Sequence, residues 1–285
     1  MTPADELARL TRLTRYFARQ VTAGDLVTQP SDTQLARMTP RSMRAYLDTL
    51  LTVRAPAPID DAVARELDDF LAARSRERVA SAGSPDALTV PTLVATHGVS
   101  GRFGTQVALW RGDLTTLRAG GVVNAANSAM LGCFVPGHRC IDNVLHAAAG
   151  PGLRAECARY MDSREGRPEE TGRALVTGGY HLPAAHVIHT VGPIVTHGVT
   201  KEHRDLLASC YRSVLDAAEG AGLDSVGLCS VSTGVFGYPK QEAAPLVLDT
   251  IGRWLDRHPD SMLRIVICAF AEVDVRAYEA ALAKM

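Results

Sequence analysis

Apolar residues recur every three or four positions in the first part of the chain, which is the spacing of amphipathic helices. Three stripes follow this spacing: Leu7, Leu10, Leu13, Tyr16 and Phe17; Leu47, Leu50 and Leu51; and Val63, Leu67, Phe70 and Leu71. Polar or proline-containing helix starts stand at Ser31-Asp32, Thr39-Pro40 and Asp60. The pattern predicts a helical region that ends at a linker over residues 81–85.

Beyond this linker, short β-prone runs alternate with helical patterns. The β-prone runs cover residues 106–111, 122–123, 174–177, 186–190, 225–230 and 264–270. The helical patterns cover residues 142–148, 153–161, 201–219 and 241–255. Such alternation predicts a three-layer α/β domain with a parallel or mixed sheet, in which ligands collect at the carboxyl ends of the strands. We therefore expect an N-terminal helical region over residues 1–89 and an α/β domain over residues 90–285.

The composition favours a globular protein of the cytoplasm. The chain has 285 residues, 46% of them hydrophobic, which is enough for a sizeable core. Its 30 basic and 31 acidic side chains leave a net charge of -1, which argues against nucleic-acid binding. The N-terminus is charged and lacks the apolar core of a signal peptide, and no apolar run approaches membrane-spanning length. Scattered cysteines fit a reducing compartment.

Three metal-binding side chains gather in one turn-rich segment. Cys133, His138 and Cys140 lie around a proline and a glycine, and thiolates and imidazole suit zinc. Structural zinc sites normally have four protein ligands, so three ligands indicate an open, catalytic position. Free thiols are an alternative. A fourth ligand from His146 or Cys157 is another, although His146 falls on a predicted helix and faces apolar positions.

A glycine-containing loop over residues 232–237 stands between a predicted strand and a predicted helix. Glycines let backbone N–H groups approach a ligand, and a helix N-terminus favours negative charge. The loop is neither a Walker A sequence nor a G-x-G-x-x-G. Taken alone, it is explained equally well as a turn without a ligand.

Five successive segments closely resemble the signatures of the macrodomain, an ADP-ribose-binding family. They are residues 112–114, 123–128, 141–151, 189–193 and 232–237, and the resemblance covers about residues 95–285. Most members carry a run of glycines where this chain reads Met-Leu-Gly-Cys-Phe-Val-Pro-Gly-His-Arg-Cys, so the chain resembles the zinc-dependent subgroup. The resemblance implies a three-layer α/β/α macrodomain with a mixed sheet, preceded here by a small N-terminal helical region.

The resemblance also implies binding roles. Asp113 would accept a hydrogen bond from the adenine amino group, although alone it is better explained as a loop cap. Phe270 would pack on the adenine, with a place in the core as the alternative. Asn127 would contact the distal ribose, and Asn124 would hold the loop. The full ligand-binding set is Asp113, Leu114, Asn124, Asn127, Ser232, Thr233, Gly234, Val235, Phe236 and Phe270, in which residues 232–236 wrap the diphosphate.

The implied reaction is hydrolysis of the bond between the distal ribose and a modified protein side chain. Asp142 matches the aspartate that orients or activates water, with an N-cap as the alternative, and Asn127 would anchor the ribose. One zinc ion per chain would be held by Cys133, His138 and Cys140. Because two thiolates offset its charge, we expect the ion to orient substrate rather than to generate free hydroxide.

Two rival functions share this site. A macrodomain can bind ADP-ribose as a reader without cutting it, or deacetylate O-acetyl-ADP-ribose. The partners implied by the resemblance are ADP-ribose and mono-ADP-ribosylated protein. Zinc-type members are associated with sirtuin-like ADP-ribosyltransferases and lipoyl-carrier proteins, which are further candidate partners. Neither a nucleic acid nor a membrane is expected as a partner.

Overall fold

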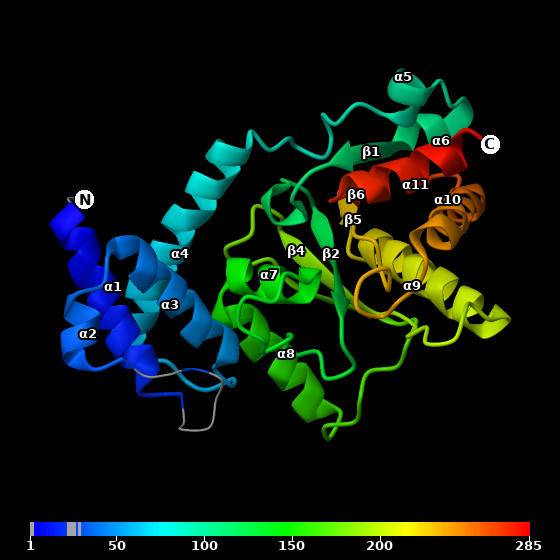
Figure 1. The fold of residues 1–285 in the computed structure, drawn as a ribbon. Helices are drawn as coiled ribbons and strands as arrows, with labels where there is room; N and C mark the ends of the chain where they lie inside the picture. Colours follow the sequence, from blue (N-terminus) through cyan, green and yellow to red (C-terminus); the bar gives the residue numbers. More distant parts are fainter. Residues whose placement is uncertain (1–2, 22–26, 28–29) are drawn as a thin grey trace.

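The computed structural model describes residues 3–21, 27 and 30–285 (Figure 1). Met1 and Thr2, the start of the charged N-terminus, lie outside the described residues. Four helices come first: α1 (Pro3–Ala18), α2 (Asp32–Ala36), α3 (Pro40–Val53) and α4 (Asp61–Ala82). The apolar stripes of the sequence form their shared core, which includes Leu10, Leu13, Phe17, Met43, Leu47, Leu50, Leu67, Phe70 and Leu71. The predicted N-terminal helical region is confirmed.

The predicted helix starts are confirmed as well. Ser31 and Thr39 are the N-caps of α2 and α3, and each side chain accepts a hydrogen bond from a backbone N–H of the first turn. Asp60 is the N-cap of α4, although its side chain makes no capping bond. Helix α4 runs two residues into the predicted linker and ends at Ala82, and the next residue, Gly83, caps it with a φ of 56°, the left-handed conformation that glycine favours.

A six-stranded sheet follows, in the order β1-β6-β5-β2-β4-β3. Its strands are β1 (Val107–Arg111), β2 (Gly121–Ala126), β3 (Ala174–Gly178), β4 (His186–Val191), β5 (Ser225–Leu228) and β6 (Arg264–Ala269). All neighbours pair in parallel except β3 and β4, which are antiparallel. The six predicted runs and the mixed sheet are therefore confirmed.

Helices cover both faces of the sheet (Figure 1). Helices α7 (Ile141–Ala149) and α8 (Pro151–Ser163) lie between the sheet and the N-terminal helices, with α3 and α4 in contact with α7. Helices α9 (Lys201–Gly220), α10 (Lys240–Arg257) and α11 (Glu272–Leu282) lie on the other side. The sequence pattern missed α11 and three short helices: α5 (Leu93–His97), α6 (Gly101–Gln106) and the 3-10 helix η1 (Leu114–Thr116).

The division at residue 90 stays a prediction. Helix α4 ends at Ala82, and Ala87 and Val90 already belong to the core around the sheet. Among the described residues, however, the two parts are joined by polar contacts as well as by packing: His181 Nε2 lies 3.0 Å from an Asp68 carboxylate oxygen of α4.

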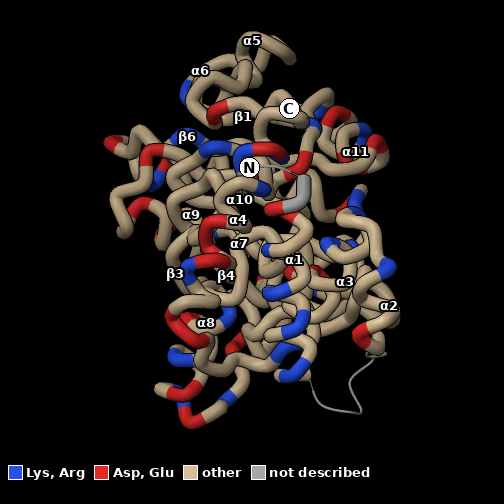
Figure 2. Tube along the Cα trace, turned by 90° about the vertical axis from the view of Figure 1, so that its left-hand side faces the viewer, with Lys and Arg blue, Asp and Glu red and all other residues tan. Residues whose placement is uncertain are grey.

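Charged residues of both signs are interspersed along the face of the chain that Figure 2 draws. No helix in the described part of the chain is both long and apolar enough to cross a bilayer.

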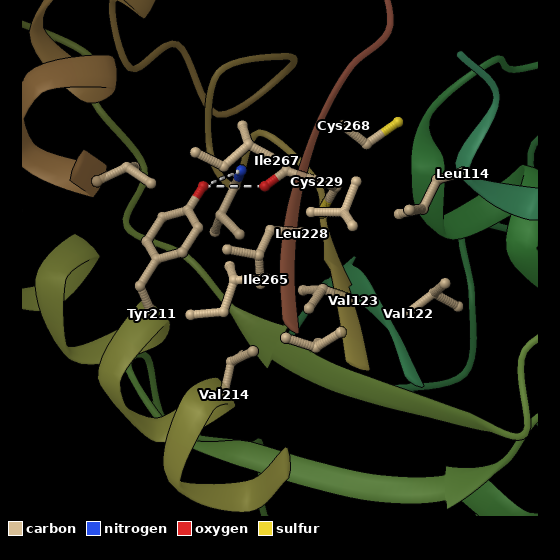
Figure 3. Close-up of a cluster of buried hydrophobic side chains, with 14 of the residues drawn as sticks. Leu114, Val122, Val123, Tyr211, Val214, Leu228, Cys229, Ile265, Ile267 and Cys268 are labelled. Atoms are coloured by element: carbon tan, nitrogen blue, oxygen red, sulfur yellow. Dashed lines mark hydrogen bonds between the residues drawn. The ribbon is translucent and has the colours of Figure 1, made fainter. Parts of the chain in front are cut away.

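The end of β5 lies in the buried core, and the chain continues from there into the glycine-containing loop over residues 232–237 (Figure 3). Tyr211 of α9 is 2% exposed, and its hydroxyl donates to the Cys229 carbonyl (2.9 Å) and accepts from the Val231 backbone N–H (3.1 Å). Apolar side chains such as Val123 and Ile265 surround this point. The loop after β5 thus starts from a rigid base.

Candidate functional site

A cavity of about 500 Å³ opens where strands β1, β2, β5 and β6 end. Its wall comes from the segments that follow these strands, from the loop before α7 and from the start of α7. Of the site residues expected from the sequence, these line it: Asp113, Leu114, Asn127, Cys133, His138, Cys140, Asp142, Ser232, Thr233, Gly234, Val235, Phe236 and Phe270. Asn124 is fully buried behind the wall. The carboxyl ends of the strands thus bring the expected segments together.

Asp142 lies at the inner wall of the cavity and is 4% exposed. Its two carboxylate oxygens accept hydrogen bonds from Asn124 Nδ2 (2.8 Å) and Asn127 Nδ2 (3.3 Å). Burial raises the pKa of this carboxyl to about 6, although the Asn124 hydrogen bond and the Arg154 charge lower it. The N-cap of α7 is Cys140, so the alternative that Asp142 caps the helix is wrong.

The two asparagines fix the backbone around this carboxylate. Asn127 Nδ2 also donates to the Gly132 carbonyl (3.0 Å), and its oxygen accepts from the Ala129 N–H (2.9 Å). Asn124 contacts His189 Nδ1 at 3.1 Å, within the core. Asn124 therefore holds Asp142 from behind, while Asn127 presents a surface to the cavity.

The two residues expected at the adenine differ in how firmly they are held. Asp113 Oδ1 accepts from the Thr115 N–H (2.9 Å) and hydroxyl (2.8 Å) and so caps η1, which leaves Oδ2 without a hydrogen-bond partner in the described part of the chain. Phe270 is 68% exposed, so the alternative that it belongs to the core is wrong. Both residues line the cavity.

The loop over residues 232–237 keeps unpaired donors. Ser232 and Gly237 have φ angles of 64° and 73°, in the left-handed region. No described residue accepts a hydrogen bond from the backbone N–H of Gly234, Val235 or Phe236. Helix α10 begins at Lys240, soon after the loop ends, so its positive N-terminal end lies nearby. These features suit an anion.

The donor atoms of Cys133, His138 and Cys140 lie within 4.8 Å of one another. Cys133 Sγ is 3.1 Å from His138 Nδ1, and Cys140 Sγ accepts from the Asn143 N–H at 3.4 Å. The Asn143 carboxamide donates to two loop carbonyls, which fixes the loop's shape. Burial raises the pKa of the Cys140 thiol to about 11, so binding of a metal cation to its sulfur would release a proton. The donor set and spacing fit zinc.

Sequence reasoning missed two features near the cavity. His146 and Cys157, considered as a fourth ligand, form a separate buried group with His189. Lys240 opens α10, lines the cavity and pairs with Asp274. The sequence feature that could have pointed to Lys240 is a basic residue between the loop over residues 232–237 and the helix that follows it.

The burial of His189 predicts that the free energy of unfolding depends on pH. Burial lowers the pKa of His189 to about 3, so between pH 3 and the usual value of about 6.5 the unfolded chain binds more protons. The free energy of unfolding should fall as pH drops through this range, by an amount on the order of a few kcal/mol. Denaturant titrations from pH 4 to 7 check this. In the variant His189→Gln, the free energy of unfolding should change less with pH, whereas His97→Gln, at an exposed position, should behave like the wild type. The same change with pH in the wild type and in both variants would contradict the prediction.

Comparisons with known proteins point to one family. The Macro domain family model matches residues 123–247. A Treponema medium protein named protein-ADP-ribose hydrolase is 37% identical over 235 residues, which are 82% of this chain and 85% of that protein. A Fusarium oxysporum f. sp. cubense protein named probable bifunctional ADP-ribose hydrolase/ADP-ribosyltransferase is 40% identical over 254 residues, or 86% of this chain. The match spans only 42% of that fungal protein's length.

A solved structure shows the same fold. The Trypanosoma brucei macrodomain in complex with ADP-ribose superposes with a TM-score of 0.59 at 30% identity. The superposition covers 86% of this chain and 96% of the trypanosomal one.

Proposed function

The chain belongs to the macrodomain family, and from that membership we propose that it binds ADP-ribose and hydrolyses the bond between ADP-ribose and a modified protein side chain. The observation that carries this proposal is a buried carboxylate, Asp142, held by two asparagines beside a Cys-His-Cys cluster in one cavity. The names of the Treponema and Fusarium relatives support the activity.

In the proposed binding mode, ADP-ribose spans the cavity from the adenine end to Asp142. The free Oδ2 of Asp113 accepts from the adenine amino group, while Leu114 and Phe270 contact the base. In the loop over residues 232–236, the unpaired amides of Gly234, Val235 and Phe236 donate to the diphosphate. Asn127 contacts the distal ribose, which places the anomeric carbon on the side of Asp142.

The proposed reaction exchanges one bond at that carbon. The bond to the protein side chain breaks, a water oxygen bonds to the anomeric carbon, and the water's proton ends on the departing side chain. Asp142 orients the water, accepts its proton and passes that proton to the departing side chain, and before the transfer its negative charge stabilises the oxocarbenium-like transition state. Asn124 and Asn127 fix the carboxylate in place, so little reorganisation is needed.

The proposed cofactor is one zinc ion, held by Cys133, His138 and Cys140. When bound, it supplies an open Lewis-acidic position that orients the ribose hydroxyls or the leaving oxygen. The apolar side chains that line the cavity, including Leu114 and Ile141, exclude water from the rest of the site.

The proposed macromolecular partners are a mono-ADP-ribosylated protein and the transferase that modifies it. The Fusarium relative's name pairs a hydrolase with an ADP-ribosyltransferase, which supports a transferase partner, and we propose one of the sirtuin-like kind. A lipoyl-carrier protein is the proposed target.

Incubation of the purified chain with mono-ADP-ribosylated protein tests the function. We expect free ADP-ribose to appear in solution and the modification to disappear from the protein's mass spectrum. Binding without release would instead identify a reader. Turnover of O-acetyl-ADP-ribose far above that of modified protein would identify a deacetylase.

Asp113→Ala should weaken ADP-ribose binding. Loss of a charge-assisted hydrogen bond costs about 1.5–3 kcal/mol, so calorimetry should show a dissociation constant raised by roughly 10- to 150-fold. Asp86→Ala is a matched control, because Asp86 likewise accepts from the N–H two residues on but does not line the cavity. Unchanged affinity in Asp113→Ala would mean that its carboxylate serves only to cap η1.

A further inference from the structure

Arg154 of α8 joins two parts of the chain that are far apart in sequence. Its guanidinium is buried, with the residue 6% exposed. Nε donates to the Leu131 carbonyl at 2.8 Å, two residues before Cys133. Nη1 donates to the carbonyls of Leu51 (2.9 Å) and Arg54 (2.7 Å), at the end of α3. One side chain therefore links the N-terminal helices to the Cys-His-Cys loop.

The same guanidinium contacts the residues on both sides of Cys133. The Phe134 ring lies beneath it, with 4.4 Å from Cζ to the ring centroid. Phe134 has a φ of 55°, which a non-glycine residue adopts only when its surroundings hold it. Gly132 has a φ of 91°, and a Cβ there would approach Arg154 Nη2 to 3.3 Å. Cys133 is thus flanked by two left-handed residues, each against Arg154.

The other end of the link is anchored in the N-terminal core. Arg54 is 5% exposed, and its guanidinium donates to Gln20 Oε1 (2.5 Å) and the Pro58 carbonyl (3.1 Å) and lies over the Phe17 ring. The Arg54 carbonyl that receives Arg154 is therefore held by the helices before the sheet. A planar guanidinium with several donors suits this task, whereas a lysine would satisfy fewer acceptors.

We propose that Arg154 is a positioning residue through which the N-terminal helices fix the backbone around Cys133 for metal binding. The inference rests on the proposed function, because it concerns the proposed zinc site. Groups that orient metal ligands typically change metal affinity by about 10- to 100-fold when they are removed. Arg154 lies outside the ligand-binding set, so ADP-ribose binding itself should depend on it much less.

Competition with a chromophoric zinc chelator tests the proposal on the full chain. Arg154→Met should lower zinc affinity by about 10- to 100-fold, and Arg154→Lys should recover part of the loss. ADP-ribose affinity, measured by calorimetry, should stay within about threefold of wild type. Arg102→Met is the matched control: Arg102 also donates to a helix-end carbonyl, Leu255 O at 2.6 Å, but on the far side of the sheet domain. It should lower the unfolding temperature and leave zinc affinity unchanged.

A second variant covers the case in which Arg154→Met does not fold. Phe134→Leu removes only the ring beneath the guanidinium and should still lower zinc affinity by several-fold. Wild-type zinc affinity in Phe134→Leu and in any folded Arg154 variant would show that Arg154 only joins the two parts of the chain, and would overturn the inference. A wild-type chain that binds no zinc would instead contradict the proposed metal, and one that binds zinc but releases no ADP-ribose would contradict the proposed activity alone.

Discussion

Replacing Asp142 by alanine is expected to lower the rate of ADP-ribose release from modified protein by about a hundredfold or more, the usual scale for losing an acid–base group. The carboxylate is the acceptor of both asparagine side chains at the inner wall of the cavity. Its removal takes away the group that orients water while leaving the adenine and diphosphate contacts in place. The affinity for ADP-ribose should therefore stay within a few-fold of wild type.

Asp142→Asn separates the chemistry from the packing. The amide keeps the size of the side chain but cannot accept a proton, so release should remain slow while the unfolding temperature stays closer to that of wild type. Asp142→Ala should be less stable, because Asn124 loses its acceptor inside the core, at a cost of about 1–3 kcal/mol. If either variant releases ADP-ribose at the wild-type rate, the proposed mechanism is wrong.

The pattern of apolar residues predicted the sheet because its strands are short, β-branched and buried. Strand β4, for example, is buried at every position but its first. Helix α11 was missed although Ala277, Tyr278 and Leu282 are buried along one face. Its first turn follows Phe270 so closely that strand and helix are hard to separate by periodicity. Helices α5 and α6 are too short to carry a periodic signal.

The sequence also predicted that most of the site segments meet at one cavity, because they follow the carboxyl ends of strands, while the Cys-His-Cys loop comes from the connection between β2 and α7 and Asp142 from the first turn of α7. Local sequence patterns could not predict the contacts between residues that are far apart in the chain. Arg154 meets Leu51 and Arg54 across about a hundred positions, and nothing in its neighbours signals this. The choice of helix cap was also hidden, since both Cys140 and Asp142 stand where α7 begins and only the fold selects Cys140.

Cys140→Ala should remove the zinc from the purified chain and, with it, most of the hydrolysis. Elemental analysis should find near-stoichiometric zinc in the wild type and little in the variant, because two remaining ligands bind far more weakly than three. The core around the sheet does not depend on this loop. The variant should therefore remain folded, with its far-ultraviolet circular dichroism close to that of wild type.

Cys140 has a second task that the experiment must separate from metal binding. Its sulfur caps α7 by accepting from the Asn143 N–H, so alanine also loses a cap worth about 1 kcal/mol. Cys140→Ser keeps a capping oxygen, and it should recover that stability without recovering zinc. Cys157→Ala is the matched control, because it removes a thiol from the separate buried group with His146 and His189. Zinc lost from Cys157→Ala and kept in Cys140→Ser would place the metal in that second group and overturn the assignment to the loop.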